Sequence, residues 1–319
     1  MNRILVVCGP TATGKTSLSL RLARKFGGEI VSADSRQVYK KLDIGTGKDL
    51  LKNSKYDPRG FYEMGGVKIW GYDLVDPKKD YSVGRYLKFA KKTIYEISRS
   101  KKLPILVGGT GLYIKAVIDG IPTALVPTNN ALRKNLMDKK VPELFEILAQ
   151  LDPIKTGSLN MSDRSNPRRL VRAIEVATWR LEKGTRRAKA ITMKKNKNID
   201  TLFIGLTAPK EKILGKIERR VDKRIKAGLI KEIGSLLEGG VKWESQAMSS
   251  LGYRHWRGYF EGRVKKEKII EDWKKEEKRY AKRQITWFKK EKRINWFDVS
   301  KPEFEKNVEK LVKKWYKME

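Results

Sequence analysis

Residues 9–16 read GPTATGKT, and this motif is the strongest indication of the fold. It fits the pattern G-x-x-x-x-G-K-[ST], follows a short apolar run and precedes an amphipathic stretch. Glycines let backbone N–H groups converge on phosphate oxygens, and the N-terminus of the following helix adds a favourable potential. The lysine adds a positive charge, and the last threonine offers a hydroxyl to Mg²⁺. The stretch therefore predicts a strand, a phosphate-binding loop and a helix that together hold a diphosphate or triphosphate.

The predicted phosphate ligands of this loop are Gly9, Thr11, Ala12, Thr13, Gly14, Lys15 and Thr16. Thr16 is also the predicted metal ligand, with Mg²⁺ as the predicted cofactor. A nucleotide hydrolase with such a loop also needs a Walker-B strand, in which four apolar residues end in Asp. The best candidate strand, Pro104–Val107, is followed instead by Gly-Gly-Thr-Gly at 108–111. This departure counts against a motor or a GTPase.

Strands and helices alternate around the loop. Short apolar runs predict strands, and apolar residues at helical spacing predict helices. The expected strands are residues 2–8, 29–32, 67–74 and 104–107, and the expected helices are residues 16–26 and 83–98. This alternation predicts an α/β fold in which a parallel sheet core that contains the P-loop is covered by helices.

The alternation stops near residue 121. From there to about residue 198 the sequence predicts no strand, two helices at 142–151 and 166–183, and a basic segment at 185–198. Residues 201–206 (TLFIGL) then predict another strand of the same sheet. A helical insertion between two parts of one α/β core is the simplest explanation of this pattern.

The C-terminal part predicts a long basic helix. Apolar residues within 269–288 lie near one helical stripe, opposite a heavily basic face. We therefore expect two domains. The P-loop α/β core comprises residues 1–121 and 200–319, including the C-terminal helices, and an all-helical insertion domain comprises residues 122–199.

Composition narrows the class of protein. The 319 residues carry a formal net charge of +35, which is spread along the chain rather than held in one tail. Such a charge attracts polyanions, of which nucleic acid is the commonest, although solvated surface lysine explains part of the excess. One cysteine and one histidine exclude a disulfide framework and a Cys/His zinc site. The early apolar run Ile4–Cys8 is too short to span a membrane or to form the core of a signal peptide, so we expect a cytoplasmic protein with no membrane contact. No heptad seam points to an oligomer and no protein partner is evident, so we expect a monomer.

Several segments in a shared order resemble the tRNA dimethylallyltransferases, also called tRNA isopentenyltransferases. Besides the loop, they are DSRQVYKKLDIGTGK at 34–48, PILVGGTGLY at 104–113, NPRRLVRAIEV at 166–176, RRVDKRIKAGLIKEI at 219–233, SLGYR at 250–254 and AKRQITWF at 281–288. The resemblance runs from about residue 4 to about residue 298.

The resemblance implies prenyl transfer. The family moves a dimethylallyl group from dimethylallyl diphosphate to the exocyclic N6 amine of the adenosine 3′-adjacent to the anticodon, in tRNAs that read UNN codons, and releases diphosphate. The loop then holds the diphosphate of the donor rather than ATP, which fits the missing Walker-B strand. The implied partners are dimethylallyl diphosphate and a tRNA anticodon stem-loop, and an RNA acceptor fits the basic charge.

Asp34 and Thr110 are the catalytic residues that the resemblance implies. The adenine amine is a poor nucleophile, so its alkylation needs a group that accepts the leaving proton, and a carboxylate suits this role. Asp34 follows the second expected strand, at the edge where α/β sites form. From the residues alone, a cap of a turn is an equal alternative for Asp34. Thr110 resembles the residue that orients the amine or bonds the bridging oxygen, with a turn-stabilising hydroxyl as the alternative.

Cations are expected where charge develops on the leaving diphosphate. Lys15 and Thr16 with Mg²⁺ are two of these groups, and Arg220 is the third by resemblance. Helix register decides whether Arg220 or its neighbour Arg219 faces the diphosphate. Arg224 stands where the family usually has an apolar methionine, which leaves its face of the helix open.

The resemblance also implies a tRNA-binding set in the core and in the insertion domain. These residues are Asp34, Ser35, Arg36, Gln37, Asn166, Arg168, Arg169, Tyr253, Lys282, Arg283 and Gln284. The Gln37 amide suits an adenine edge, which becomes accessible when the nucleotide leaves its stack. A solvated basic face is the alternative for the lysines, and Tyr253 either stacks on a loop base or packs in the core. The basic segment at 185–198 is either an RNA-grasping loop or exposed charge.

Two other functions use the same features. A P-loop nucleoside or metabolite kinase would transfer phosphate from ATP, and residues 122–200 resemble its lid in charge alone. A non-catalytic RNA-binding module would keep the loop as a relic, but Lys15, Thr16, Asp34 and Thr110 are all present. Binding of dimethylallyl diphosphate with indifference to ATP would exclude the kinase.

Overall fold

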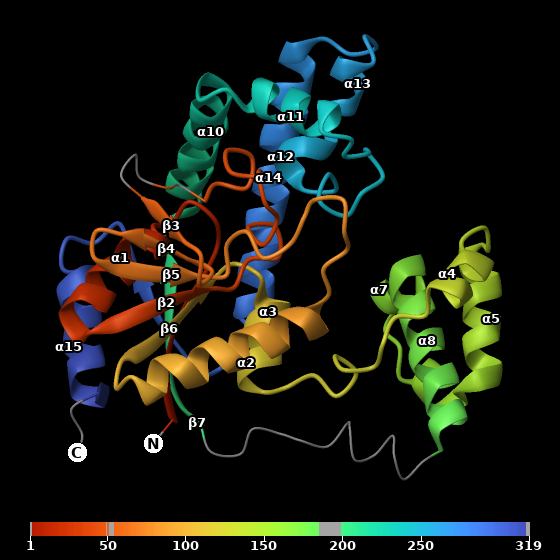
Figure 1. Cartoon of the computed structure of the whole chain (residues 1–319), viewed down its shortest axis with the longest axis horizontal. Coiled ribbons are helices and arrows are strands. Elements are labelled where there is room, and N and C mark those ends of the chain that lie inside the picture. The colour runs from red at the N-terminus through yellow and green to blue at the C-terminus, as the bar shows by residue number, and fades with distance from the viewer. Residues whose placement is uncertain (1, 49, 51–53, 185–198, 317–319) are drawn as a thin grey trace. The chain divides into compact units, whose positions relative to one another are not determined.

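The computed structural model describes residues 2–48, 50, 54–184 and 199–316. It is a mixed α/β protein with a central sheet and helices (Figure 1). The chain forms two compact units, one of Met1–Ile118 with Lys197–Glu319 and one of Asp119–Asn196. The predicted insertion, residues 122–199, begins and ends three residues later than this second unit. The basic segment at 185–198 lies outside the described residues.

Eight strands of the described chain form one sheet, in the order β3-β4-β5-β2-β6-β1-β7-β8. They are β1 (Asn2–Cys8), β2 (Gly28–Ser32), β3 (Lys55–Asp57), β4 (Phe61–Met64), β5 (Val67–Trp70), β6 (Leu103–Gly108), β7 (Ile199–Thr207) and β8 (Ile294–Asp298). Neighbours from β5 to β8 are parallel, and the β3-β4-β5 edge is antiparallel. Every residue of β2 and β6 is buried, as expected for parallel strands covered on both faces.

Strand register brings three connecting segments to one edge of the sheet. Cys8 at the end of β1 pairs with Gly108 at the end of β6, and Ser32 at the end of β2 pairs with Val107. Because these strands are parallel, the chain leaves all three at the same edge. The loop after β1, the segment after β2 and the turn after β6 therefore meet there.

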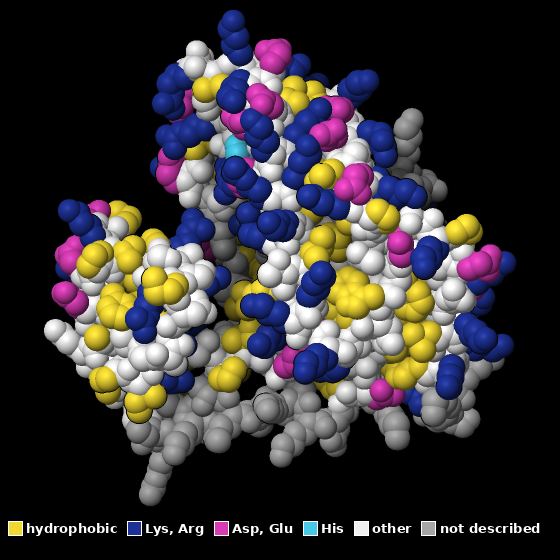
Figure 2. Space-filling view, turned by 180° about the vertical axis from the view of Figure 1, so that it is seen from behind, with side chains coloured by type: hydrophobic (Ala, Val, Ile, Leu, Met, Phe, Trp, Pro, Cys, Tyr) yellow, Lys and Arg dark blue, Asp and Glu magenta, His cyan; other side chains and the backbone are white. Residues whose placement is uncertain are grey.

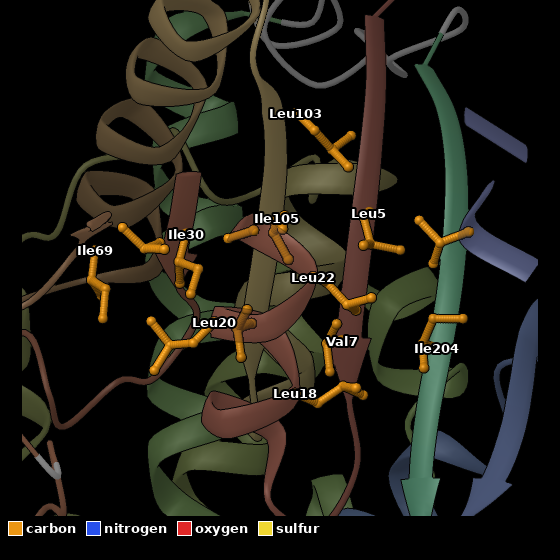
Figure 3. Close-up of a cluster of buried hydrophobic side chains, with 14 of the residues drawn as sticks. Leu5, Val7, Leu18, Leu20, Leu22, Ile30, Ile69, Leu103, Ile105 and Ile204 are labelled. Atoms are coloured by element: carbon orange, nitrogen blue, oxygen red, sulfur yellow. The ribbon is translucent and has the colours of Figure 1, made fainter. Parts of the chain in front are cut away.

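The helices of the first unit include the one that begins at the loop. They are α1 (Lys15–Phe26), α2 (Val83–Arg99), α3 (Gly111–Ile118), α10 (Lys210–Lys226), α11 (Leu229–Glu238), α12 (Leu251–Arg254), α13 (Arg257–Phe260), α14 (Lys266–Phe288) and α15 (Phe304–Tyr316). α1 places Leu18 and Leu22 in one core cluster with Leu5, Val7 and Ile105 of the sheet (Figure 3). Full burial of a leucine contributes about 1.5–3 kcal/mol, so this cluster fixes the helix that begins at the loop.

The second unit is helical in its described part. Its helices are α4 (Asn130–Leu136), α5 (Val141–Leu151), α6 (Pro153–Gly157), α7 (Met161–Arg164) and α8 (Pro167–Lys183). Leu144, Leu148 and Leu170 belong to its own core. The guanidinium of Arg133 donates two hydrogen bonds, of 2.8 and 2.9 Å, to the buried carboxylate of Glu175. The unit thus has a hydrophobic cluster and a buried carboxylate with an arginine partner of its own.

The expected strands and helices are confirmed with small shifts at their ends, but the sequence pattern does not predict β3, β4 and β8 or the short helices α4, α6 and α7 of the second unit. β3 and β4 have three and four residues, too few to show a period of two. The strand expected at 67–74 ends at Trp70, because Gly71 turns the chain with φ 97°. No helix in the described ranges is both long and apolar enough to cross a membrane.

Candidate active site

The loop between β1 and α1 depends on backbone conformations that favour glycine. Gly9 and Gly14 have φ of 131° and 80°, and Ala12 also lies in the left-handed region with φ 64°. A Cβ on Gly9 would lie 2.4 Å from the carbonyl oxygen of Leu206 in β7. No side chain caps the N-terminus of α1, so its first backbone N–H groups are available to an anion.

Lys15 and Arg220 place two cations at this loop. The Lys15 Nζ donates to the Pro10 carbonyl at 2.7 Å. Arg220, from α10, donates from Nη1 to the Thr11 hydroxyl at 2.6 Å. Arg219, one position earlier, is exposed. Arg220 is therefore the arginine of the pair whose guanidinium reaches the loop.

Burial and the positive charge of Arg220 together lower the pKa of Lys15 to about 8, against the opposing effect of Asp34. The neighbouring thiol of Cys8 is neutral at this pH, since burial raises its pKa to about 12. The ammonium is therefore only partly charged above pH 8 in the free protein. A bound anion favours the charged form, so anion binding takes up a proton.

This shift predicts a pH dependence of anion affinity. We expect the affinity for inorganic diphosphate to fall as the pH rises through about 8, by up to about tenfold per pH unit. Calorimetric titrations between pH 6.5 and 9.5 would measure it. Lys15→Met is the control, because it keeps the ionisation of the ligand and removes that of the lysine. Equal pH profiles for the two proteins would contradict the prediction.

Asp34 and Thr110 lie on two turns that are bonded to each other. The Ala33 N–H donates to the Val107 carbonyl at 2.6 Å, and the Thr110 N–H donates to the Ala33 carbonyl at 3.3 Å. The Ser35 N–H donates to the Thr110 hydroxyl at 3.2 Å. These bonds hold the two predicted catalytic side chains next to each other, beside the loop.

The Asp34 carboxylate has two different oxygens. Oδ1 accepts the backbone N–H of Arg36 at 2.8 Å and that of Gln37 at 3.4 Å, so Asp34 does cap its turn. No donor from the described residues bonds Oδ2. Capping and proton acceptance are thus compatible, because each uses a different oxygen.

Gln37 and Arg36 are held by the protein itself. The Gln37 Oε1 accepts from the Ser32 hydroxyl at 3.0 Å, and its Nε2 donates to the Gly47 carbonyl at 2.9 Å. Arg36 donates from Nη1 to the Gln246 carbonyl at 2.7 Å. For Gln37 to contact a base, one of these amide contacts has to be exchanged or shared.

Tyr253 and Gln284, predicted above as RNA contacts, are buried in this structure, with 0% and 5% exposure. The Tyr253 hydroxyl donates to Glu232 at 2.6 Å, so packing is observed rather than an exposed stacking ring. Gln284 bonds the backbone of the active-site turns. Lys282 and Arg283, on the same helix, are exposed. The pattern of apolar residues along a helix cannot separate these neighbours, because the exposed and the buried positions are one residue apart.

The other predicted tRNA contacts lie in the second unit. The Asn166 side chain caps α8 by accepting the Arg169 N–H at 3.2 Å. The Arg169 guanidinium pairs with Asp163 at 2.6 Å, while Arg168 is exposed. The structure therefore groups the predicted residues into two sets, one on each unit.

Two residues that the sequence analysis did not assign also belong to the site's framework. The hydroxyl of Tyr280, on α14, shares a hydrogen bond with Thr110, and burial raises the Tyr280 pKa well above its ordinary value, which keeps the phenol neutral. The Glu232 carboxylate accepts the backbone N–H groups of residues 43–45 at 3.0, 2.8 and 3.2 Å. The signal for Tyr280 is its position one helical turn before Gln284, whereas nothing local marks Glu232.

Comparison with known protein families identifies the family to which this chain belongs. A family model described as IPP transferase matches residues 37–291, and one described as isopentenyl transferase matches residues 2–62. The chain belongs to the tRNA dimethylallyltransferase family. Curated members include one from Anoxybacillus flavithermus, 36% identical over 97% of this chain and 95% of its own length. Another, from Caldanaerobacter subterraneus, is 38% identical over 93% of this chain and 92% of its own length.

Solved structures of the tRNA dimethylallyltransferase family share the fold. The tRNA isopentenylpyrophosphate transferase of Bacillus halodurans is 31% identical, with a TM-score of 0.68, and the match covers 100% of this chain and 99% of that one. A eukaryotic dimethylallyltransferase described as acting on tRNA is 25% identical, with a TM-score of 0.75, over 97% of this chain and 78% of that chain. The chain is thus an enzyme of this family.

Proposed function

We propose that this protein transfers a dimethylallyl group from dimethylallyl diphosphate to the N6 amine of the adenosine 3′-adjacent to the anticodon, in tRNAs that read UNN codons. The observation that carries the proposal is the shared sheet edge, where an anion-binding loop lies beside the bonded turns of Asp34 and Thr110. β6, the strand next to β1, ends without a carboxylate. This arrangement suits displacement of diphosphate by an amine better than hydrolysis or transfer of a nucleotide phosphate.

The proposed step breaks one bond and forms one. The N6 lone pair attacks C1 of the dimethylallyl group, and the C1–O electron pair leaves with the bridging oxygen of diphosphate. Oδ2 of Asp34 accepts the proton that the amine loses. The Thr110 hydroxyl holds the amine or the bridging oxygen, and Lys15 and Arg220 stabilise the charge that develops on diphosphate.

Mg²⁺ is the proposed cofactor, with Thr16 as its protein ligand. The described residues contain no group of three or more His, Cys, Asp or Glu that would cage a metal. A hydroxyl beside a diphosphate fits Mg²⁺, because this ion usually keeps several waters and binds substrate phosphates. When bound, the ion would neutralise part of the charge on the leaving group.

The anticodon stem-loop is the proposed macromolecular partner. Exposed Lys282 and Arg283 lie on α14, and exposed Arg168 lies on α8 of the second unit. Figure 2 shows Lys and Arg side chains spread over the face that it presents rather than gathered at one point. Such a distribution suits phosphate contacts along an RNA. A tRNA substrate also leads us to propose a cytoplasmic enzyme that acts as a monomer.

One incubation tests the proposal. The protein is mixed with labelled dimethylallyl diphosphate, Mg²⁺ and unmodified tRNA that reads UNN codons, and the RNA is digested and analysed by mass. We expect the five-carbon label on the adenosine beside the anticodon. Transfer of γ-phosphate from ATP to a small acceptor, with no prenyl transfer, would replace the proposal by the kinase alternative.

A further inference from the structure

Gln284 lies between the two halves of the proposed active site. Its Oε1 accepts the backbone N–H of Thr11 in the anion-binding loop at 2.8 Å. Its Nε2 donates to the carbonyl of Gly109, next to Thr110, at 2.9 Å. With 5% of its surface exposed, the side chain has both ends of its amide committed to backbone groups. One side chain therefore connects the loop for the donor to the turn that carries Thr110.

The contact between α14 and this turn leaves little free space. A Cβ added to Gly109 would lie 2.1 Å from the Gln284 Nε2, and one added to Gly111 would lie 2.0 Å from the Trp287 Nε1. The two glycines thus permit a close approach, since any other residue there would force these side chains to move. Side chains of α14 therefore pack directly against the turn.

The helix that carries Gln284 is well anchored. α14 has 23 residues, and Trp273, Ala281 and Phe288 along it are buried. The hydroxyl of Tyr280, one turn before Gln284, interacts with the side chain of Thr110. The buried residues along α14 therefore help to fix the position of Gln284, in addition to its contacts with the loop and the turn.

We propose that Gln284 is a positioning residue that sets the spacing between the diphosphate loop and Thr110. The inference rests on the proposed function, because the spacing matters only if a donor on the loop reacts with an acceptor held near Thr110. Reacting atoms need to approach to about 3–3.5 Å, and a misplacement of about 1 Å costs on the order of 100-fold in rate. Gln284 would act through the backbone of the two turns, without contact to either substrate.

Gln284→Met tests this role, since methionine has a similar length but neither an amide donor nor an amide acceptor. We expect kcat for prenyl transfer to fall by about 10–100-fold. The affinities for inorganic diphosphate and for the anticodon stem-loop should change by less than about threefold, because both binding surfaces remain. Thr286→Ala is the matched control, as this exposed residue on α14 bonds only the carbonyl of Lys282 in its own helix.

Gly109→Ala is a second variant that leaves Gln284 in place. The added Cβ would force the Gln284 amide away from the turn, so the same fall in kcat is expected. If kcat falls equally in the two variants, the cause is the changed spacing of the two turns, because Gly109→Ala keeps the amide of Gln284.

Three results would overturn the positioning role. A raised KM for tRNA with unchanged kcat in Gln284→Met would make the residue an RNA contact. A lowered Tm with unchanged kcat would make it structural only, and unchanged kinetics in both variants would leave it without a role. If the unsubstituted protein transferred no prenyl group in the same assay, the proposed function would fail first, and the positioning role with it.

Discussion

Asp34→Asn should lower the single-turnover rate of prenyl transfer by about 100-fold or more. The amide cannot accept the proton that the N6 amine loses. It can still offer one oxygen to the N–H groups of Arg36 and Gln37, so the turn is expected to keep its shape. The affinity for the anticodon stem-loop should stay within about threefold of the unsubstituted protein, since one hydrogen-bond acceptor is retained.

The comparison with Asp34→Ala separates the two oxygens of this carboxylate. Alanine removes the cap and the base together. We therefore expect the Asp34→Ala enzyme to transfer the prenyl group no faster than the Asp34→Asn enzyme and to bind RNA more weakly. The rate is measured with labelled donor at saturating tRNA, and the affinity by a gel-shift titration. Nearly normal turnover of Asp34→Asn would show that another group takes the proton.

Lys15→Met should reduce kcat/KM for dimethylallyl diphosphate by about 100–1,000-fold. Lys15 is the first residue of α1 and the only cationic side chain within residues 9–16, so no other cation of the loop can replace it in binding phosphate. Part of the loss is expected in donor affinity, and the rest in kcat, because more charge lies on the diphosphate in the transition state than before it.

Lys25→Met is the matched control for that experiment. Lys25 lies on the same helix, in its last turn, and its ammonium pairs with Glu309 of α15 at the surface. We expect donor kinetics to be unchanged and stability to fall by less than about 1 kcal/mol. If Lys15→Met kept a normal kcat/KM for the donor, the loop would not be the diphosphate site.

The parts of the site that follow from sequence are those that local rules determine. A strand, a glycine-rich loop and a helix are adjacent in the chain, so residues 9–16 predict them together. Asp34 and Thr110 are distant in sequence, yet each directly follows a strand, and parallel strands bring their ends to one edge. The proximity of these two residues was therefore predictable before their hydrogen bonds were seen.

The parts of the site that cannot be predicted from the sequence depend on how a helix is rotated against distant segments of the chain. Gln284 is 273 residues from Thr11, and the pattern of α14 gives its stripe but not which polar residue turns inward. The same limit applies to Tyr253, which precedes an exposed arginine and is itself fully buried. Glu232 bonds backbone N–H groups, and backbone groups leave no trace in a sequence pattern.

The distance of Gln284 from the loop also affects the biosynthesis of the enzyme. β1 is made first, but its neighbour β7 follows only after the helical insertion, since Asn2 pairs with Ile199. α14 is made later still, so the loop and the Thr110 turn are synthesised well before the side chain that joins them. Domains fold as they emerge, and pairings between distant segments form slowly. A nascent chain, although surrounded by tRNA at the ribosome, therefore lacks the complete site until α14 has been synthesised.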